Sequence, residues 1–92
     1  MICRALEDVA VRLDRLQAAR VAGAFEYMCS SARRIAVIAG GLGMTDVAHA
    51  ARHVGCAADS GSAVAVAATL ARLERSFDAG ISAVWAVSHP FA

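Results

Sequence analysis

Residues 31–46, SARRIAVIAGGLGMTD, contain the clearest helix boundary in the sequence. An apolar segment with helical spacing ends here in a glycine-rich run, residues 40–43, and a new segment follows it. Glycine readily adopts the left-handed conformation in which many helices end. Thr45 or Asp46 is then placed to cap the next helix. The stretch therefore predicts a helix end, a short turn and the start of a second helix.

Around this stretch, apolar residues recur every three or four positions, which is the period of an amphipathic helix. The pattern predicts helices over about residues 2–20, 25–39, 45–58 and 62–87. The breaks fall at Gly23, at residues 40–43 and at residues 60–62, where a serine is expected to cap the last helix. The expected buried stripes are Ile2, Leu6, Val9, Leu13 and Leu16; Phe25, Met28, Ala32, Ile35 and Ala39; Met44, Val47, Ala51, Val54 and Ala58; and Val66, Leu70, Leu73, Phe77 and Val84. Four such helices with short connections predict an all-α fold, an antiparallel up-and-down four-helix bundle.

Composition narrows the class of protein. The 92 residues, 59% of them hydrophobic and 5% aromatic, predict a single domain over residues 1–92. A net charge of +1 argues against a nucleic-acid partner. No apolar run reaches the roughly 20 residues of a membrane span, and Arg4, Glu7 and Asp8 interrupt any signal peptide, so we expect a cytoplasmic protein. The three cysteines have neither disulfide nor metal spacing.

The central stretch resembles the signature of histidine phosphotransfer (HPt) domains, which reads roughly A-H-x-L-K-G-x-A-x-x-L-G. The residues in register with it are Ala32, Ile35, Ala39, Leu42, Gly43 and Met44. Arg33 stands where the family has its phosphoacceptor histidine, and Ala36 and Val37 replace the family's lysine and glycine. The resemblance implies a signalling module of a two-component phosphorelay, whose partner is a receiver domain or a histidine kinase.

These substitutions change the expected chemistry. Arginine stays protonated, with a pKa above about 12, and offers no nucleophilic lone pair comparable to that of imidazole. We therefore expect neither an enzyme nor a cofactor, but a pseudo-HPt docking or adaptor protein. At 100° per residue, Arg33 lies about 120° from the centre of its apolar stripe and is expected to point outward. The expected docking residues are Glu26, Ser30, Arg33, Arg34, Ala36 and Val37.

Two alternatives remain open. In the first, phosphate would be transferred to His49 or His53, which are one helical turn apart with Asp46 nearby. Two histidines at this spacing are by themselves only a weak indication of a metal site, and we expect no metal. Otherwise the protein is a structural bundle that self-associates, as a homodimer for example. The interface would then be formed by apolar residues on the surface and in the tail: Val37, Ile81, Trp85 and Phe91. Gly80 is expected to weaken the last helix by about 1 kcal/mol relative to alanine.

Overall fold

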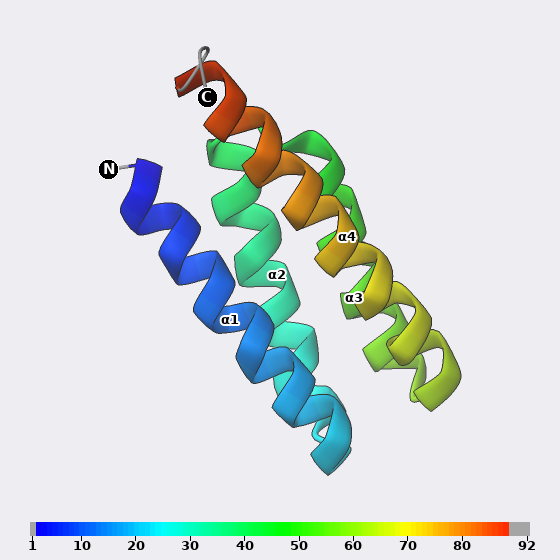
Figure 1. Cartoon of the computed structure of the whole chain (residues 1–92). Helices are drawn as coiled ribbons and strands as arrows, with labels where there is room; N and C mark the ends of the chain where they lie inside the picture. Colours follow the sequence, from blue (N-terminus) through cyan, green and yellow to red (C-terminus); the bar gives the residue numbers. More distant parts are fainter. Residues whose placement is uncertain (1, 89–92) are drawn as a thin grey trace.

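Residues 2–88 form four helices that run in alternating directions. The computed structural model describes the backbone of residues 2–88 and the side chains of residues 4–84. The helices are α1 (Ile2–Ala22), α2 (Phe25–Gly41), α3 (Thr45–Ser60) and α4 (Ala63–Ser88). Figure 1 shows that the start of α1 and the end of α4 lie at the same end of the bundle. The predicted all-α four-helix bundle is confirmed, and the first three helices each end two residues later than expected.

Each helix packs on the next one along the chain, and α1 closes the bundle against α4. The α2–α3 interface is the most extensive and the α1–α4 interface the smallest. Small residues line the α2–α3 interface. A β-carbon added to Gly55 of α3 would lie only 3.9 Å from Cβ of Ala32 of α2. Because the distance between helix axes depends on the side chains at the contact, α2 and α3 approach each other closely.

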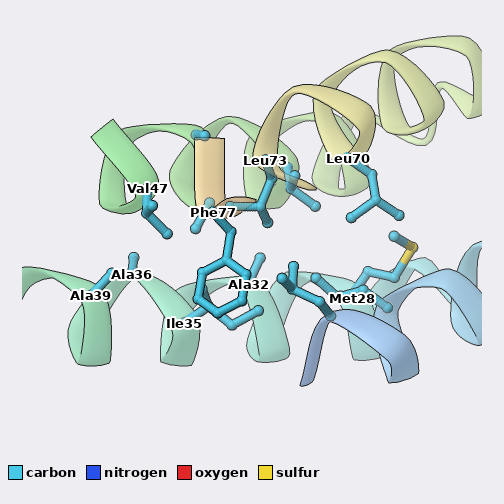
Figure 2. Close-up of a cluster of buried hydrophobic side chains, with 14 of the residues drawn as sticks. Met28, Ala32, Ile35, Ala36, Ala39, Val47, Leu70, Leu73 and Phe77 are labelled. Atoms are coloured by element: carbon cyan, nitrogen blue, oxygen red, sulfur yellow. The ribbon is translucent and has the colours of Figure 1, made fainter. Parts of the chain in front are cut away.

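The core follows the predicted stripes. Figure 2 shows its central part, where side chains of α2 face those of α3 and α4 and the ring of Phe77 points toward α2. The larger fully buried side chains are Val9, Leu16, Met28, Ile35, Val47, Val54, Val66, Leu70 and Leu73. Of the stripe residues, Leu6, Phe25, Met44 and Val84 are only partly buried. The side chain of Ile2 lies outside the described residues.

The turn between α2 and α3 is closed by backbone hydrogen bonds. The Met44 N–H donates to the Ala39 carbonyl (2.9 Å), and the Gly43 N–H donates to the Gly40 carbonyl (3.1 Å). Gly43 has a φ of +76°, so these two bonds form a Schellman motif with Gly43 as its left-handed residue. Gly40 and Gly41 lie within α2 and have no positive φ, so Gly43 is the only residue of the 40–43 run whose backbone conformation requires glycine.

The predicted cap of α3 by Thr45 or Asp46 is wrong. The N-cap is Met44, which makes no side-chain capping bond, and its carbonyl accepts the Ala48 N–H at 3.0 Å. The physical reason is that the Schellman motif ends at Met44, so the same residue closes α2 and opens α3. The α1–α2 turn repeats this arrangement, with Gly23 at a φ of +71° and Ala24 as the N-cap of α2.

The predicted serine cap of α4 is confirmed. The hydroxyl of Ser62 accepts a hydrogen bond from the Ala65 N–H at 3.2 Å, which satisfies one of the free donors of the first turn. Gly61 ends α3 in the left-handed conformation just before it.

Polar contacts hold α1 in place. The side-chain amide of Gln17 donates to Glu74 Oε1 of α4 at 2.6 Å, and Arg20 Nε donates to Gln17 Oε1 at 3.0 Å. On the exposed side of α1, Arg12 and Asp8 form an ion pair at 3.0 Å.

Over the described residues, no helix combines the length and the apolar character that crossing a membrane requires.

Candidate functional site

Four of the six expected docking residues lie along one side of α2, beside α3. Glu26, Ser30, Arg33 and Val37 follow one another at intervals of four, three and four residues, so they share one face of the helix. All four are exposed, and Val37 is 65% exposed despite its apolar side chain. The prediction that Arg33 points away from the core is confirmed.

Next to this face, α2 and α3 border an open surface groove, which we call the α2/α3 groove. One part of it, about 450 Å³, is lined by Arg33, Ala36 and Val37 of α2 and by Arg52, Gly55, Cys56 and Asp59 of α3. A second part, about 510 Å³, is lined by Glu26, Cys29, Ser30, Arg33, Ala58 and Asp59. Because Arg33 and Asp59 line both parts, the two form one continuous groove.

Small residues form the floor of the α2/α3 groove. Ala36 is only 6% exposed and Gly55 is buried. The thiol of Cys29 donates to the Gly55 carbonyl at 3.2 Å, which ties the two helices together beneath the groove. Ala36, expected among the docking residues, therefore forms part of the groove floor and presents little exposed surface. A partner side chain can approach the helix backbones closely at this floor.

The charges that line the groove are not paired with each other. Within the described residues, neither Arg33 nor Arg52 has a carboxylate oxygen within 4.0 Å. Asp59 and Glu26 likewise have no cationic partner at that distance. The groove therefore presents two guanidinium groups and two carboxylates that are free to meet charges on another molecule.

Arg34 does not share this position. It is exposed on α2, but it is absent from the residues that line either part of the groove. It lies one residue from Arg33, which turns its side chain about 100° around the helix axis. Arg34 is therefore a matched control for Arg33: the same residue type on the same helix, outside the groove.

Sequence reasoning missed the α3 wall of the groove. Arg52, Cys56 and Asp59 are all exposed and follow the i, i+4, i+7 spacing of one helix face. That spacing was a usable signal. It becomes decisive only once α3 is placed beside α2, because a helical period does not say which neighbour a face borders.

The two histidines lie elsewhere. His49 and His53 are both exposed on α3, but they line a shallow hollow of about 220 Å³ between α3 and α4, together with Asp46, Arg72 and Ser76. Among the residues that the structure describes, no group of three or more histidine, cysteine or acidic side chains is arranged to hold a metal ion.

The apolar residues of the self-association alternative are not all available for an interface. Ile81 is partly buried and packs against the core, whereas Val37 is free on the surface. The side chain of Trp85 and the whole of Phe91 lie outside the described residues.

Comparison of the chain with protein-family models, with curated proteins and with solved structures found no match.

Proposed function

We propose that this chain is a docking or adaptor module of two-component signalling, which binds a receiver domain or a histidine kinase through the α2/α3 groove without accepting phosphate. The observation that carries the proposal is the position of Arg33. Its side chain is exposed on the wall of a groove, and no carboxylate of the described residues lies within 4.0 Å of it. Such a cation is available for charge-assisted, bidentate hydrogen bonds to carboxylates of a partner.

The resemblance to HPt domains supplies the partner class. In that family, the residue at the histidine position meets the phosphorylatable aspartate of a receiver and the acidic side chains around it. A guanidinium at this position complements that acidic pocket electrostatically. It provides no nucleophile for the phosphoryl group, so a receiver bound in this way keeps its phosphate.

Val37 supports the same surface with an apolar contact. The residue is 65% exposed and lines the groove beside Arg33. Burial of an apolar side chain contributes about 25 cal/mol per Å² of surface removed from water. An arginine at the centre of an interface typically costs about 2 kcal/mol or more when it is truncated, and a rim arginine costs much less.

The test is a binding titration against the receiver domains and histidine kinases of the same organism. Arg33→Ala is expected to weaken binding about 30-fold, the equivalent of about 2 kcal/mol, and Val37→Asp is expected to abolish it. Arg34→Ala, the matched control, is expected to change the affinity less than about threefold, since its side chain lies outside the groove. If Arg33→Ala and Val37→Asp bind every detected partner as the unmodified chain does, the groove is not the docking site.

A second candidate function is phosphotransfer through His49 or His53. One observation favours it: both imidazoles are exposed, and Arg72 lines the same hollow, where its charge would stabilise a phosphoryl group. These histidines lie outside the stretch that resembles the family signature. The experiment that separates this function from docking alone is transfer of label from a phosphorylated receiver to the chain, which His49→Ala or His53→Ala would then abolish.

A further inference from the structure

The charges of the α2/α3 groove are ordered along its length. On α3, Arg52 and Asp59 are seven residues apart, and on α2, Glu26 and Arg33 are also seven residues apart. Seven residues of helix span about 10 Å. Because α2 and α3 run in opposite directions, Arg33 and Arg52 both lie toward the end of the bundle where α2 finishes. The groove therefore has a basic end and an acidic end.

The midpoints of the two charge pairs lie at the same level. Cys29 and Ser30 stand midway between Glu26 and Arg33, and Gly55 and Cys56 stand midway between Arg52 and Asp59. The Cys29 thiol contacts the Gly55 carbonyl at 3.2 Å, which fixes these midpoints beside each other across the groove. The four charges are thus placed symmetrically about one line that crosses both helices.

When a second copy of this surface is turned end to end, its acidic end faces the basic end of the first copy. Homodimers most often form around a two-fold axis, in which the same patch of both copies meets and each residue pair occurs twice. An axis that crosses the helices at the shared midpoint reverses the second copy. Arg52 of one copy then faces Asp59 of the second copy, and Arg33 faces Glu26 of the second copy. An axis parallel to the helices would instead bring the two basic ends together, which costs free energy.

We infer that the α2/α3 groove is the interface of a homodimer whose two-fold axis crosses α2 and α3 beside Cys56. Four opposite-charge contacts close the dimer, two at each end.

The dimer stands independently of the proposed docking function, although it uses the same surface. It covers Arg33, so a chain engaged with a second copy is unavailable to a receiver. If the docking proposal also holds, self-association regulates docking, and dilution of the protein releases the docking surface.

The test uses the chain alone and measures its mass by sedimentation or light scattering over a range of concentrations. The unmodified chain is expected to rise from 9.5 kDa toward twice that mass. Arg52→Glu alone and Asp59→Arg alone are each expected to weaken dimerisation at least tenfold, because each places two pairs of like charges in the interface. An equimolar mixture of the two variants is expected to restore the dimer, since the substituted pair and the native pair are then both of opposite charge.

Matched controls lie on α4, where Arg75 and Asp78 are exposed away from the groove. Arg75→Glu and Asp78→Arg are expected to dimerise as the unmodified chain does. Circular dichroism checks that every variant is folded. A chain that stays at the mass of one copy at all concentrations overturns the inference, and so does a mixture that fails to restore the dimer.

A second measurement locates the axis without changing any charge. A short bis-maleimide reagent is expected to join two copies through their Cys56 thiols, which are exposed and lie beside the axis. Replacement of Cys56 by serine is expected to remove that cross-linked product. If the Cys56→Ser chain cross-links as efficiently as the unmodified chain, the axis does not pass beside Cys56. Neither experiment involves a receiver, so failure of the dimer and failure of docking are distinguished.

Discussion

The side chain of Met44 fills the space that a β-carbon on Gly80 would need. Cε of Met44 lies 2.6 Å from the position of that β-carbon, and Cγ2 of Val47 lies 3.8 Å from it. Met44 belongs to the turn before α3 and Gly80 to the second half of α4. The missing side chain therefore lets this turn pack directly on α4. Gly80 has a packing role in addition to the helix-propensity cost that the sequence predicts.

The first prediction is that Gly80→Ala and Met44→Ala are energetically coupled. In the Met44→Ala chain, Gly80→Ala is expected to raise the free energy of unfolding by about 1 kcal/mol, the usual difference in helix propensity. In the unmodified chain the gain is expected to be smaller by about 0.5 kcal/mol or more, because the Met44 methyl group must move. Urea unfolding followed by circular dichroism measures both. Equal effects in the two backgrounds would contradict the packing role.

Two glycines near the end of α2, Gly40 within the helix and Gly43 in the turn after it, are expected to respond in opposite directions to replacement by alanine. Gly40 lies in α2 with no atom within 4 Å of an added β-carbon, so Gly40→Ala is expected to stabilise the protein by about 0.5–1 kcal/mol. Gly43 has a φ of +76°, so Gly43→Ala is expected to destabilise it by about 1 kcal/mol or more. Thermal unfolding of the two variants measures the contrast. If both substitutions changed the stability in the same direction, the proposed left-handed role of Gly43 in the turn would be contradicted.

Ser31 is expected to be better replaced by alanine. Its side chain is only 5% exposed, and its hydroxyl has no hydrogen-bond partner among the described residues. Removal of a buried, unsatisfied hydroxyl group is expected to stabilise the protein by about 1 kcal/mol. The control is Ser30→Ala, the neighbouring serine of the same helix, whose exposed hydroxyl donates to the Tyr27 carbonyl at 3.1 Å. Both changes share the same gain in helix propensity, so the difference between them in chemical unfolding reports the buried hydroxyl of Ser31 together with the exposed hydrogen bond that Ser30→Ala loses. No difference would mean that the Ser31 hydroxyl is satisfied in solution.

The absence of a histidine at position 33 predicts that the chain does not accept phosphate. Incubation with a receiver labelled on its aspartyl phosphate is expected to leave the chain unlabelled, while an HPt protein that carries the histidine takes the label from the same receiver. Acid-labile label on this chain that disappears in His49→Ala or His53→Ala would contradict the prediction. It would also establish the second candidate function, since it would assign the acceptor to the hollow between α3 and α4.

The sequence alone predicted the four helices because an apolar period is a local property. Each segment buries the residues that recur every three or four positions, whatever the neighbouring helices are. The same reasoning placed Arg33 and Val37 on the surface and Ser62 at the start of α4, and these predictions are confirmed. The resemblance to HPt domains stays a prediction.

Which neighbour each helix face contacts became clear only from the packing of the helices. The N-cap of α3 is Met44 and not the predicted Thr45 or Asp46, because the Schellman motif of the preceding turn ends at Met44. The packing of the helices also joined Arg52 and Asp59 to Arg33 in one groove. A helical period fixes the angle of a side chain around its own axis. Which neighbouring helix lies at that angle depends on contacts between residues far apart in the chain, and the groove exists only through those contacts.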